Sequence, residues 1–109
     1  VIYSLGNFIS NQIMELLGTP FTEDGLMVNI EITKNTDKTF VSKVNCIPTW
    51  VNKYNDGSKI VFEVLPITNN EDFSHLDNIT LEKLKNSYNN TASQVKQSDI
   101  INVMDNPFK

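Results

Sequence analysis

The sequence has little of what most enzymes use for chemistry. Its 109 residues include one cysteine, Cys46, one histidine, His75, and four scattered glycines. A single cysteine excludes an internal disulfide and a cysteine-cluster metal site, and the glycines form no phosphate-binding loop. His75 has no Ser or Cys motif beside it, and no His, Asp and Glu cluster shows metal-ligand spacing. We therefore expect that this chain alone is not an enzyme and carries no cofactor.

The chain also lacks an excess of basic residues and a long apolar run. Nine basic residues face thirteen acidic ones, which gives a net charge of -4 and a pI near 4.8. A nucleic-acid partner is not expected, because a phosphate backbone needs clustered cations. No apolar stretch reaches the roughly 18 residues that span a bilayer. With 39% hydrophobic and 20% charged residues, the composition is typical of a folded globular domain.

Three segments predict an antiparallel meander. In residues 26–33 every second residue is apolar, as in a strand with one buried face. Residues 40–51 and 59–67 also have extended patterns. The connections at residues 35–38 and 55–57 are short and contain Asn, Asp or Gly, which favour tight turns. Consecutive strands joined by such turns pair in antiparallel fashion.

The first residues predict another strand. Residues 1–5 are mostly β-branched, aromatic or apolar, and such a strand at the very start suggests a chain cut from a longer protein. Gly6 is expected to end or bulge this strand. Residues 13–17 predict one or two helical turns closed by Gly18 and Pro20, with a long loop as the alternative.

After residue 67 the pattern changes to helices. An amphipathic helix is expected from apolar residues at spacings of three and four, with Asp77 or Thr80 as its N-cap; these residues are Leu81, Leu84, Tyr88, Ala92 and Val95. We expect Trp50 to pack against this helix. A last short helix is expected at residues 100–104, capped from residues 98–99.

Together these elements predict the α+β class. An antiparallel sheet would carry one or two C-terminal helices packed on it. Residues 1–67 would form the sheet-rich part, and residues 68–109 a helical extension that packs on the sheet.

Three kinds of reactive side chain are given structural interpretations. Cys46 lies in an alternating segment and is expected to be a buried small hydrophobic residue rather than a reactive thiol. The adjacent acidic residues at 23–24 and 71–72 are interpreted as solvated loops. His75 is expected at the surface.

One polar cluster remains as a candidate site. Ser4, Gly6 and Asn7 follow directly on the first predicted strand. A ligand can approach the backbone closely at Gly6, and the Asn7 amide offers both a donor and acceptors. The structural alternative, which the residues alone favour, is a bulge at Gly6 and hydrogen bonding of Asn7 to the local backbone.

The same residues begin a resemblance to a known family. Residues 1–12 read VIYSLGNFISNQ, which resembles a late segment of the CapA family of poly-γ-glutamate capsule synthesis proteins. Residues 24–28, DGLMV, are similar to that family's next strand, and residues 47–51, IPTWV, to its Pro-x-Trp strand. The resemblance ends at about Ile67.

The resemblance implies a fold and a missing site. It implies the C-terminal portion of a metallophosphatase-like α/β sandwich, whose strand-end loops hold Asp, Asn, Glu and His residues around a divalent metal. The family's Gly-His-Pro-His segment and its other acidic and histidine motifs precede the string at residues 1–12. The metal would therefore belong to the full-length protein, with Ser4, Gly6 and Asn7 at the rim of its cleft.

The implied function is that of a structural and interaction part of a cell-surface protein for capsule biosynthesis. An N-terminal anchor outside this chain would hold the protein on the extracellular face of the bacterial membrane. The expected partners are the upstream part of the same protein and other capsule synthesis or export proteins. Copies of this chain are also expected to form a homodimer, by edge pairing or by exchanging residues 1–10.

Two other functions compete with this interpretation. In the first, the chain is the non-catalytic sheet of a metal-dependent phosphoesterase whose ligands lie upstream, with Asn7 at the cleft rim. In the second, Trp50 and Tyr54 form a polymer-binding platform beside Lys43 and Lys53. The acidic balance of the chain disfavours that platform, because poly-γ-glutamate is itself an anion.

Overall fold

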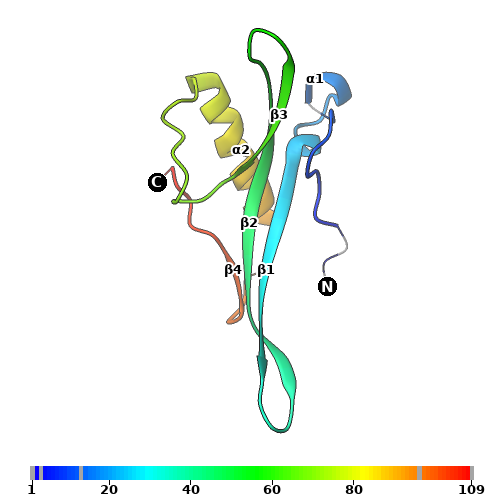
Figure 1. The fold of residues 1–109 in the computed structure, drawn as a ribbon, viewed down its shortest axis with the longest axis vertical. Helices are drawn as coiled ribbons and strands as arrows, with labels where there is room; N and C mark the ends of the chain where they lie inside the picture. Colours follow the sequence, from blue (N-terminus) through cyan, green and yellow to red (C-terminus); the bar gives the residue numbers. More distant parts are fainter. Residues whose placement is uncertain (1, 3, 13, 96, 109) are drawn as a thin grey trace.

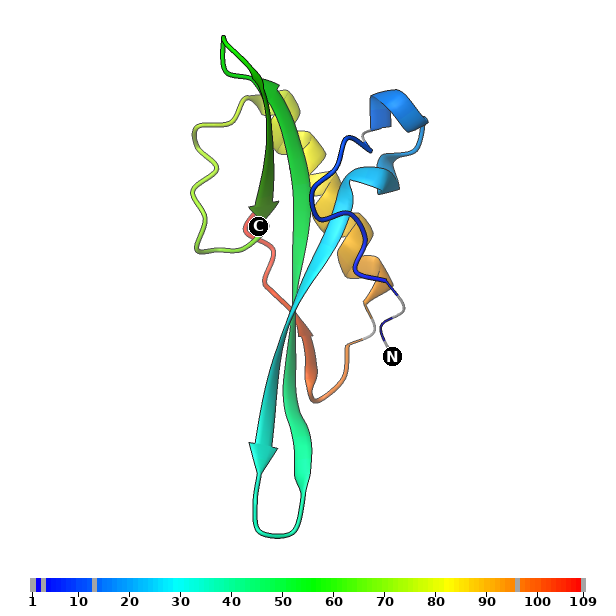
Figure 2. The same cartoon turned by 45° about the vertical axis from the view of Figure 1, so that its right-hand side comes forward.

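The computed structural model describes residues 2, 4–12, 14–95 and 97–108. These residues form a four-stranded sheet with one long helix, α2, packed against it (Figure 1). The molecule measures 57 × 27 × 26 Å, because a two-stranded arm projects from a wider body (Figure 2). The predicted α+β class is confirmed.

The arm is the hairpin of β1 (Asp24–Lys34) and β2 (Thr39–Asn55). The two strands pair antiparallel from Asp24 opposite Trp50 to Lys34 opposite Thr39, with one register shift after Glu31. Asn35 closes the turn, since its side chain accepts hydrogen bonds from the backbone N–H groups of Asp37 and Lys38. The predicted strand and turn are confirmed. The expected buried face is wrong for the outer half of β1, because Ile30 and Ile32 are exposed on the arm.

β3 (Ile60–Pro66) completes the predicted meander by pairing antiparallel with the C-terminal half of β2. The Asp56 carboxylate organises the turn between them by accepting hydrogen bonds from the backbone N–H groups of Ser58 and Lys59. These bonds lower the pKa of Asp56 below its usual value.

The expected helix at residues 100–104 is wrong. Residues Ile101–Val103 form β4, which pairs in parallel with β2 at Val44, Asn45 and Cys46. A short apolar run does not distinguish a helix from a strand, and the free edge of β2 supplies a partner from far along the sequence. The division of the chain at residue 67 stays a prediction, although β4 shows that the second part contributes to the sheet.

The predicted amphipathic helix is α2 (Asn78–Gln94). Asp77 is its N-cap, and its carboxylate accepts a hydrogen bond of 2.8 Å from the backbone N–H of Thr80. The apolar core lies between this helix, the sheet and the segments that flank the helix; its buried members are Trp50, Leu65, Ile67, Phe73, Leu84 and Tyr88. The expected packing of Trp50 against the helix is confirmed.

The N-terminal segment differs from its prediction. The described residues among the first five form no strand, while Val1 and Tyr3 lie outside the described part. Instead, Gly6 makes one antiparallel bridge to Gly25. Two short helices follow, α1 (Met14–Leu17), as predicted, and the 3-10 helix η1 (Pro20–Glu23), which leads directly into β1. The backbone turns at Gly6, which has a positive φ, so the described part of this segment bridges β1 at one point and does not pair along it.

Candidate functional site

The three predicted rim residues lie together on the segment that crosses β1. The backbone N–H of Asn7 donates to the Asp24 carbonyl at 2.9 Å, and that of Leu26 donates to the Leu5 carbonyl at 2.7 Å. Gly6 has a positive φ of 74°, which turns the chain at this crossing. The Ser4 hydroxyl accepts a hydrogen bond from the Gly6 N–H.

Glycine at position 25 is what permits the crossing. A Cβ atom added to Gly25 would lie 2.0 Å from the Asn7 carbonyl oxygen, and one added to Gly6 would lie 2.6 Å from the Asp24 carbonyl oxygen. Both neighbouring atoms are backbone, so no side-chain rotation relieves the contact. Two glycines therefore hold residues 5–7 against β1.

The Asn7 side chain joins this segment to η1. Its Nδ2 donates to the Thr22 carbonyl at 2.9 Å, and its Oδ1 accepts from the Ser10 hydroxyl at 2.8 Å. Ser4, Gly6 and Asn7 line one cavity of about 510 Å³, which Phe21 and Thr22 also border. The Asn7 amide thus donates to a backbone carbonyl, but the expected local partner is wrong, because Thr22 is 15 residues away.

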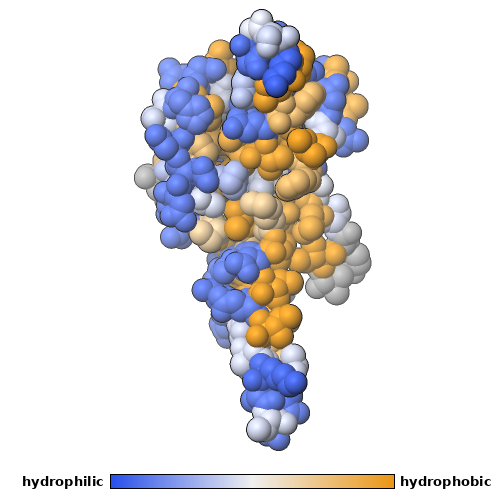
Figure 3. Space-filling model, viewed as in Figure 1, coloured by the Kyte–Doolittle hydropathy of each residue, from blue (hydrophilic) through white to orange (hydrophobic). Residues whose placement is uncertain are grey.

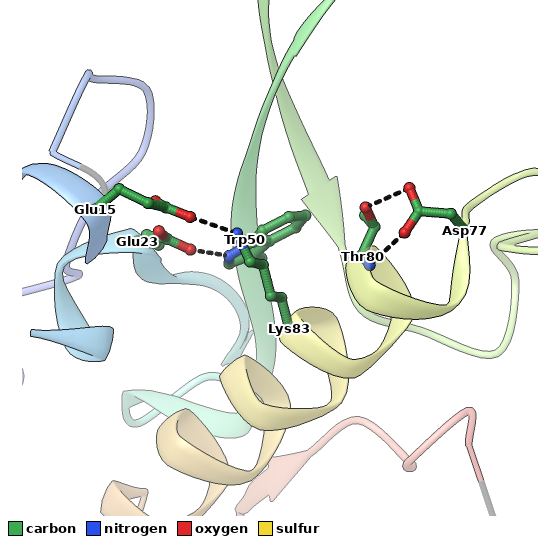
Figure 4. Close-up of polar contacts among 6 residues, drawn as sticks. All are labelled: Glu15, Glu23, Trp50, Asp77, Thr80 and Lys83. Atoms are coloured by element: carbon green, nitrogen blue, oxygen red, sulfur yellow. Dashed lines mark hydrogen bonds and ion pairs between the residues drawn. The ribbon is translucent and has the colours of Figure 1, made fainter.

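A buried acid, Glu23, lies next to this segment and contradicts the interpretation of residues 23–24 as a solvated loop. Glu23 is 5% exposed, and its carboxylate accepts a hydrogen bond of 2.7 Å from the Trp50 indole N–H (Figure 4). The end of η1 and the start of β1 place Glu23 beside β2. Sequence reasoning missed this pair because its partners are 27 residues apart.

An ion pair lies near Glu23 at the surface. Glu15 of α1 and Lys83 of α2 form an ion pair with 2.6 Å between Oε1 and Nζ (Figure 4). The Lys83 ammonium lowers the pKa of Glu15, and the Glu15 carboxylate raises the pKa of Lys83. The two residues are 68 positions apart in the sequence, and their ion pair connects α1 to α2.

The larger cavity is an apolar groove of about 880 Å³ between the N-terminal segment and the end of α2. We call it the β1–α2 groove; its lining includes Leu5, Leu26, Val44, Cys46, Val95 and Ile101, with Asp24 and Asn90 as polar members. Ser4 and Gly6 belong to both cavities. The Asp24 carboxylate accepts a hydrogen bond of 3.1 Å from the Asn90 amide.

The remaining reactive side chains lie outside any cluster. Cys46 is 3% exposed, as expected, and burial raises the pKa of its thiol. His75 is exposed and, as expected, lies at the surface. Within residues 2–108, apart from the undescribed positions, no three His, Cys, Asp or Glu side chains gather in a way that would hold a metal ion. No helix in that same part is long and apolar enough to cross a bilayer.

Comparisons with known proteins give no relative. No protein-family model matches the chain, and neither a curated protein nor a solved structure matches it. The family assignment therefore stays a proposal that depends on the residues quoted above.

Proposed function

We propose that this chain is the C-terminal structural and interaction part of a cell-surface protein for poly-γ-glutamate capsule biosynthesis. The observation that supports this proposal most directly is spatial. The three segments that resemble the CapA family, residues 1–12, 24–28 and 47–51, meet at one place in the fold. Gly6 bridges Gly25, and Gly25 pairs in turn with Thr49.

This meeting gives the three segments one shared location, which supports the proposal. The segments are separated by 11 and 18 residues in the sequence, and the β1–β2 register together with the glycine crossing brings them into contact. The same region contains the buried hydrogen bond between Glu23 and Trp50, so it is also a structural centre of the chain.

In this proposal the chain supplies a sheet and a helix, and the chemistry lies upstream. The upstream part of the protein would hold any divalent metal, and an N-terminal anchor would place the assembly on the extracellular face of the bacterial membrane. Other capsule synthesis or export proteins would be its partners.

A bacterial capsule assay tests the proposal. Gly25→Ala in the full-length protein should lower cell-bound poly-γ-glutamate, because it separates two of the three segments; Asn29→Ala, on the exposed part of the same strand, is the matched control. Both variants should be quantified on the cell surface by immunoblot. Normal polymer in cells that hold Gly25→Ala at the level of the control would reject the proposal.

The alternative function is the non-catalytic sheet of a metal-dependent phosphoesterase. It is favoured by one observation: Ser4, Gly6 and Asn7 all border the cavity beside η1. In this alternative an upstream metal site would face that cavity, and these residues would form its rim.

Asn7→Ala separates this alternative from the first proposal. In the full-length protein, removal of the amide should lower turnover of a phosphodiester by about tenfold, the loss typical of one positioning hydrogen bond of about 1.4 kcal/mol. Circular dichroism should show a folded protein. Asn29→Ala serves as the control, and kinetics equal to those of the control would eliminate the role of Asn7.

Self-association is the third proposal, and it follows from the arm. Apolar side chains continue from the body onto the narrow arm (Figure 3). Ile30 is 49% exposed and Ile32 is 66% exposed. Beyond Leu26, no described strand pairs with the outer edge of β1. An open apolar edge is a template for another strand.

Ile30→Lys should weaken this association. A two-fold pairing of β1 centred on Ile30 would set Val28 opposite Ile32 and Glu31 opposite Asn29, so a lysine at the centre faces its own copy. We expect the dimer dissociation constant to rise at least about tenfold, a loss of roughly 1.4 kcal/mol. Sedimentation equilibrium measures it, with Ile79→Lys on α2 as the control. A chain that stays monomeric at millimolar concentration would contradict the proposal.

A further inference from the structure

We propose that the β1–α2 groove binds an organic cation with an apolar body, such as an aliphatic primary ammonium ion. This inference concerns the chain itself and does not depend on the capsule proposal. It follows from the volume of the groove, its apolar lining and the Asp24 carboxylate, which has no ion-pair partner among the described residues.

The groove has the size and composition of a small-molecule site. Its volume of about 880 Å³ lies within the range of roughly 300–1,000 Å³ that is typical of ligand pockets. Strands β1, β2 and β4 supply apolar side chains, and the end of α2 and the N-terminal segment lie along its sides. The apolar lining includes Leu26, Val44 and Ile101, which would contact an alkyl chain.

A carboxylate borders this apolar lining, and no described side chain forms an ion pair with it. Asp24 lines the groove, and its hydrogen-bond donor there is the neutral amide of Asn90. In the described part of the chain Asp24 forms no ion pair. Burial raises its pKa, and the neighbouring Glu23 adds to that effect, while Ser87 and Asn90 oppose it. The charge of a bound cation would oppose both effects, because it favours the ionised carboxylate.

The end of α2 adds a second negative feature. Gln94 and Val95, the last helical residue and the C-cap, both line the groove. The last turn has no basic residue, and the next residue, Lys96, lies outside the described part. A helix of 17 residues has a partial negative charge at its C-terminus, which attracts cations. Apolar lining, a carboxylate and a helix C-terminus together select an amphipathic cation over a neutral or anionic ligand.

Three probes of equal length test this selection on the isolated chain. Hexylammonium, 1-hexanol and hexanoate are titrated separately into ¹⁵N-labelled protein at neutral pH and constant ionic strength. We expect saturable shifts at the amides of Asp24, Val44, Cys46 and Asn90 with hexylammonium, at an affinity about tenfold above that of hexanol. Hexanoate should bind more weakly than hexanol. Equal affinity for the three probes, or no saturable shift at these amides, would overturn the proposal.

A variant tests the role of the carboxylate. Asp24→Asn should make the affinities for hexylammonium and hexanol about equal. Both probes should still bind, because the apolar lining is unchanged. Asp37→Asn, on the exposed hairpin turn, makes the same change in net charge and should keep the preference. If Asp24→Asn fails to fold, the ratio of the affinities for hexylammonium and hexanol in the unaltered chain tests the proposal. A preference retained in folded Asp24→Asn would overturn the proposal.

Discussion

Gly25→Ala is expected to release residues 5–7 from β1. The new methyl group would overlap the Asn7 carbonyl oxygen, so the two hydrogen bonds of the crossing, from Asn7 and from Leu26, should be lost. Each bond contributes about 1 kcal/mol, so the free energy that holds residues 5–7 on β1 should fall by about 2 kcal/mol. Amide hydrogen exchange at Asn7 and Leu26 should accelerate by roughly 30-fold.

A glycine pair gives an independent check of the same contact. Gly6 and Gly18 have φ values of 74° and 70°, so the left-handed backbone should destabilise alanine by a similar free energy at both positions. At Gly6 the added Cβ atom also meets the backbone of β1, whereas at Gly18 it meets no atom within 4 Å. Gly6→Ala should therefore accelerate exchange at Leu26, and Gly18→Ala should not. Equal exchange in the two variants would show that the crossing does not depend on this fit.

Leu84→Ala is expected to have the largest effect on global stability. Leu84 is fully buried in α2 and contacts the core cluster that includes Trp50 and Tyr88. Truncation of a buried leucine leaves a cavity and costs about 2–5 kcal/mol, a large share of the stability of a domain this small. Urea unfolding followed by circular dichroism measures the free energy of unfolding.

Ile79→Ala is the matched control for the helix. Ile79 lies five residues earlier in α2 and is 75% exposed, so its truncation should change the free energy of unfolding by less than about 0.5 kcal/mol. If the two variants lost the same stability, α2 would not be packed on the sheet through Leu84.

The parts of this fold that were predicted are those with local causes. The alternation in residues 26–33, the Asn35 turn and the helical stripe behind Asp77 each depend on neighbours within a few residues. The burial of Cys46 follows from the alternation in its own segment of β2. Such patterns act before any long-range contact forms, so the sequence displays them directly.

The parts that were missed depend on partners far along the chain. β4 exists because β2 has a free edge at Val44–Cys46, more than 50 residues away. The burial of Glu23 depends on Trp50, and the crossing at Gly6 depends on Gly25. The rim at Ser4, Gly6 and Asn7 stays a prediction. The partners of Asn7 were not predictable, because η1 brings Thr22 to it only in the folded chain.

The most direct test of the account is an assay of the purified chain with added metal. We predict that Mn²⁺ or Zn²⁺ produces neither a tight stoichiometric binding isotherm by calorimetry nor hydrolysis of bis(p-nitrophenyl) phosphate above the rate of buffer and metal alone. A tight one-to-one site together with saturable hydrolysis that Asn7→Ala abolishes would contradict the claim that the chemistry belongs to another part of the protein.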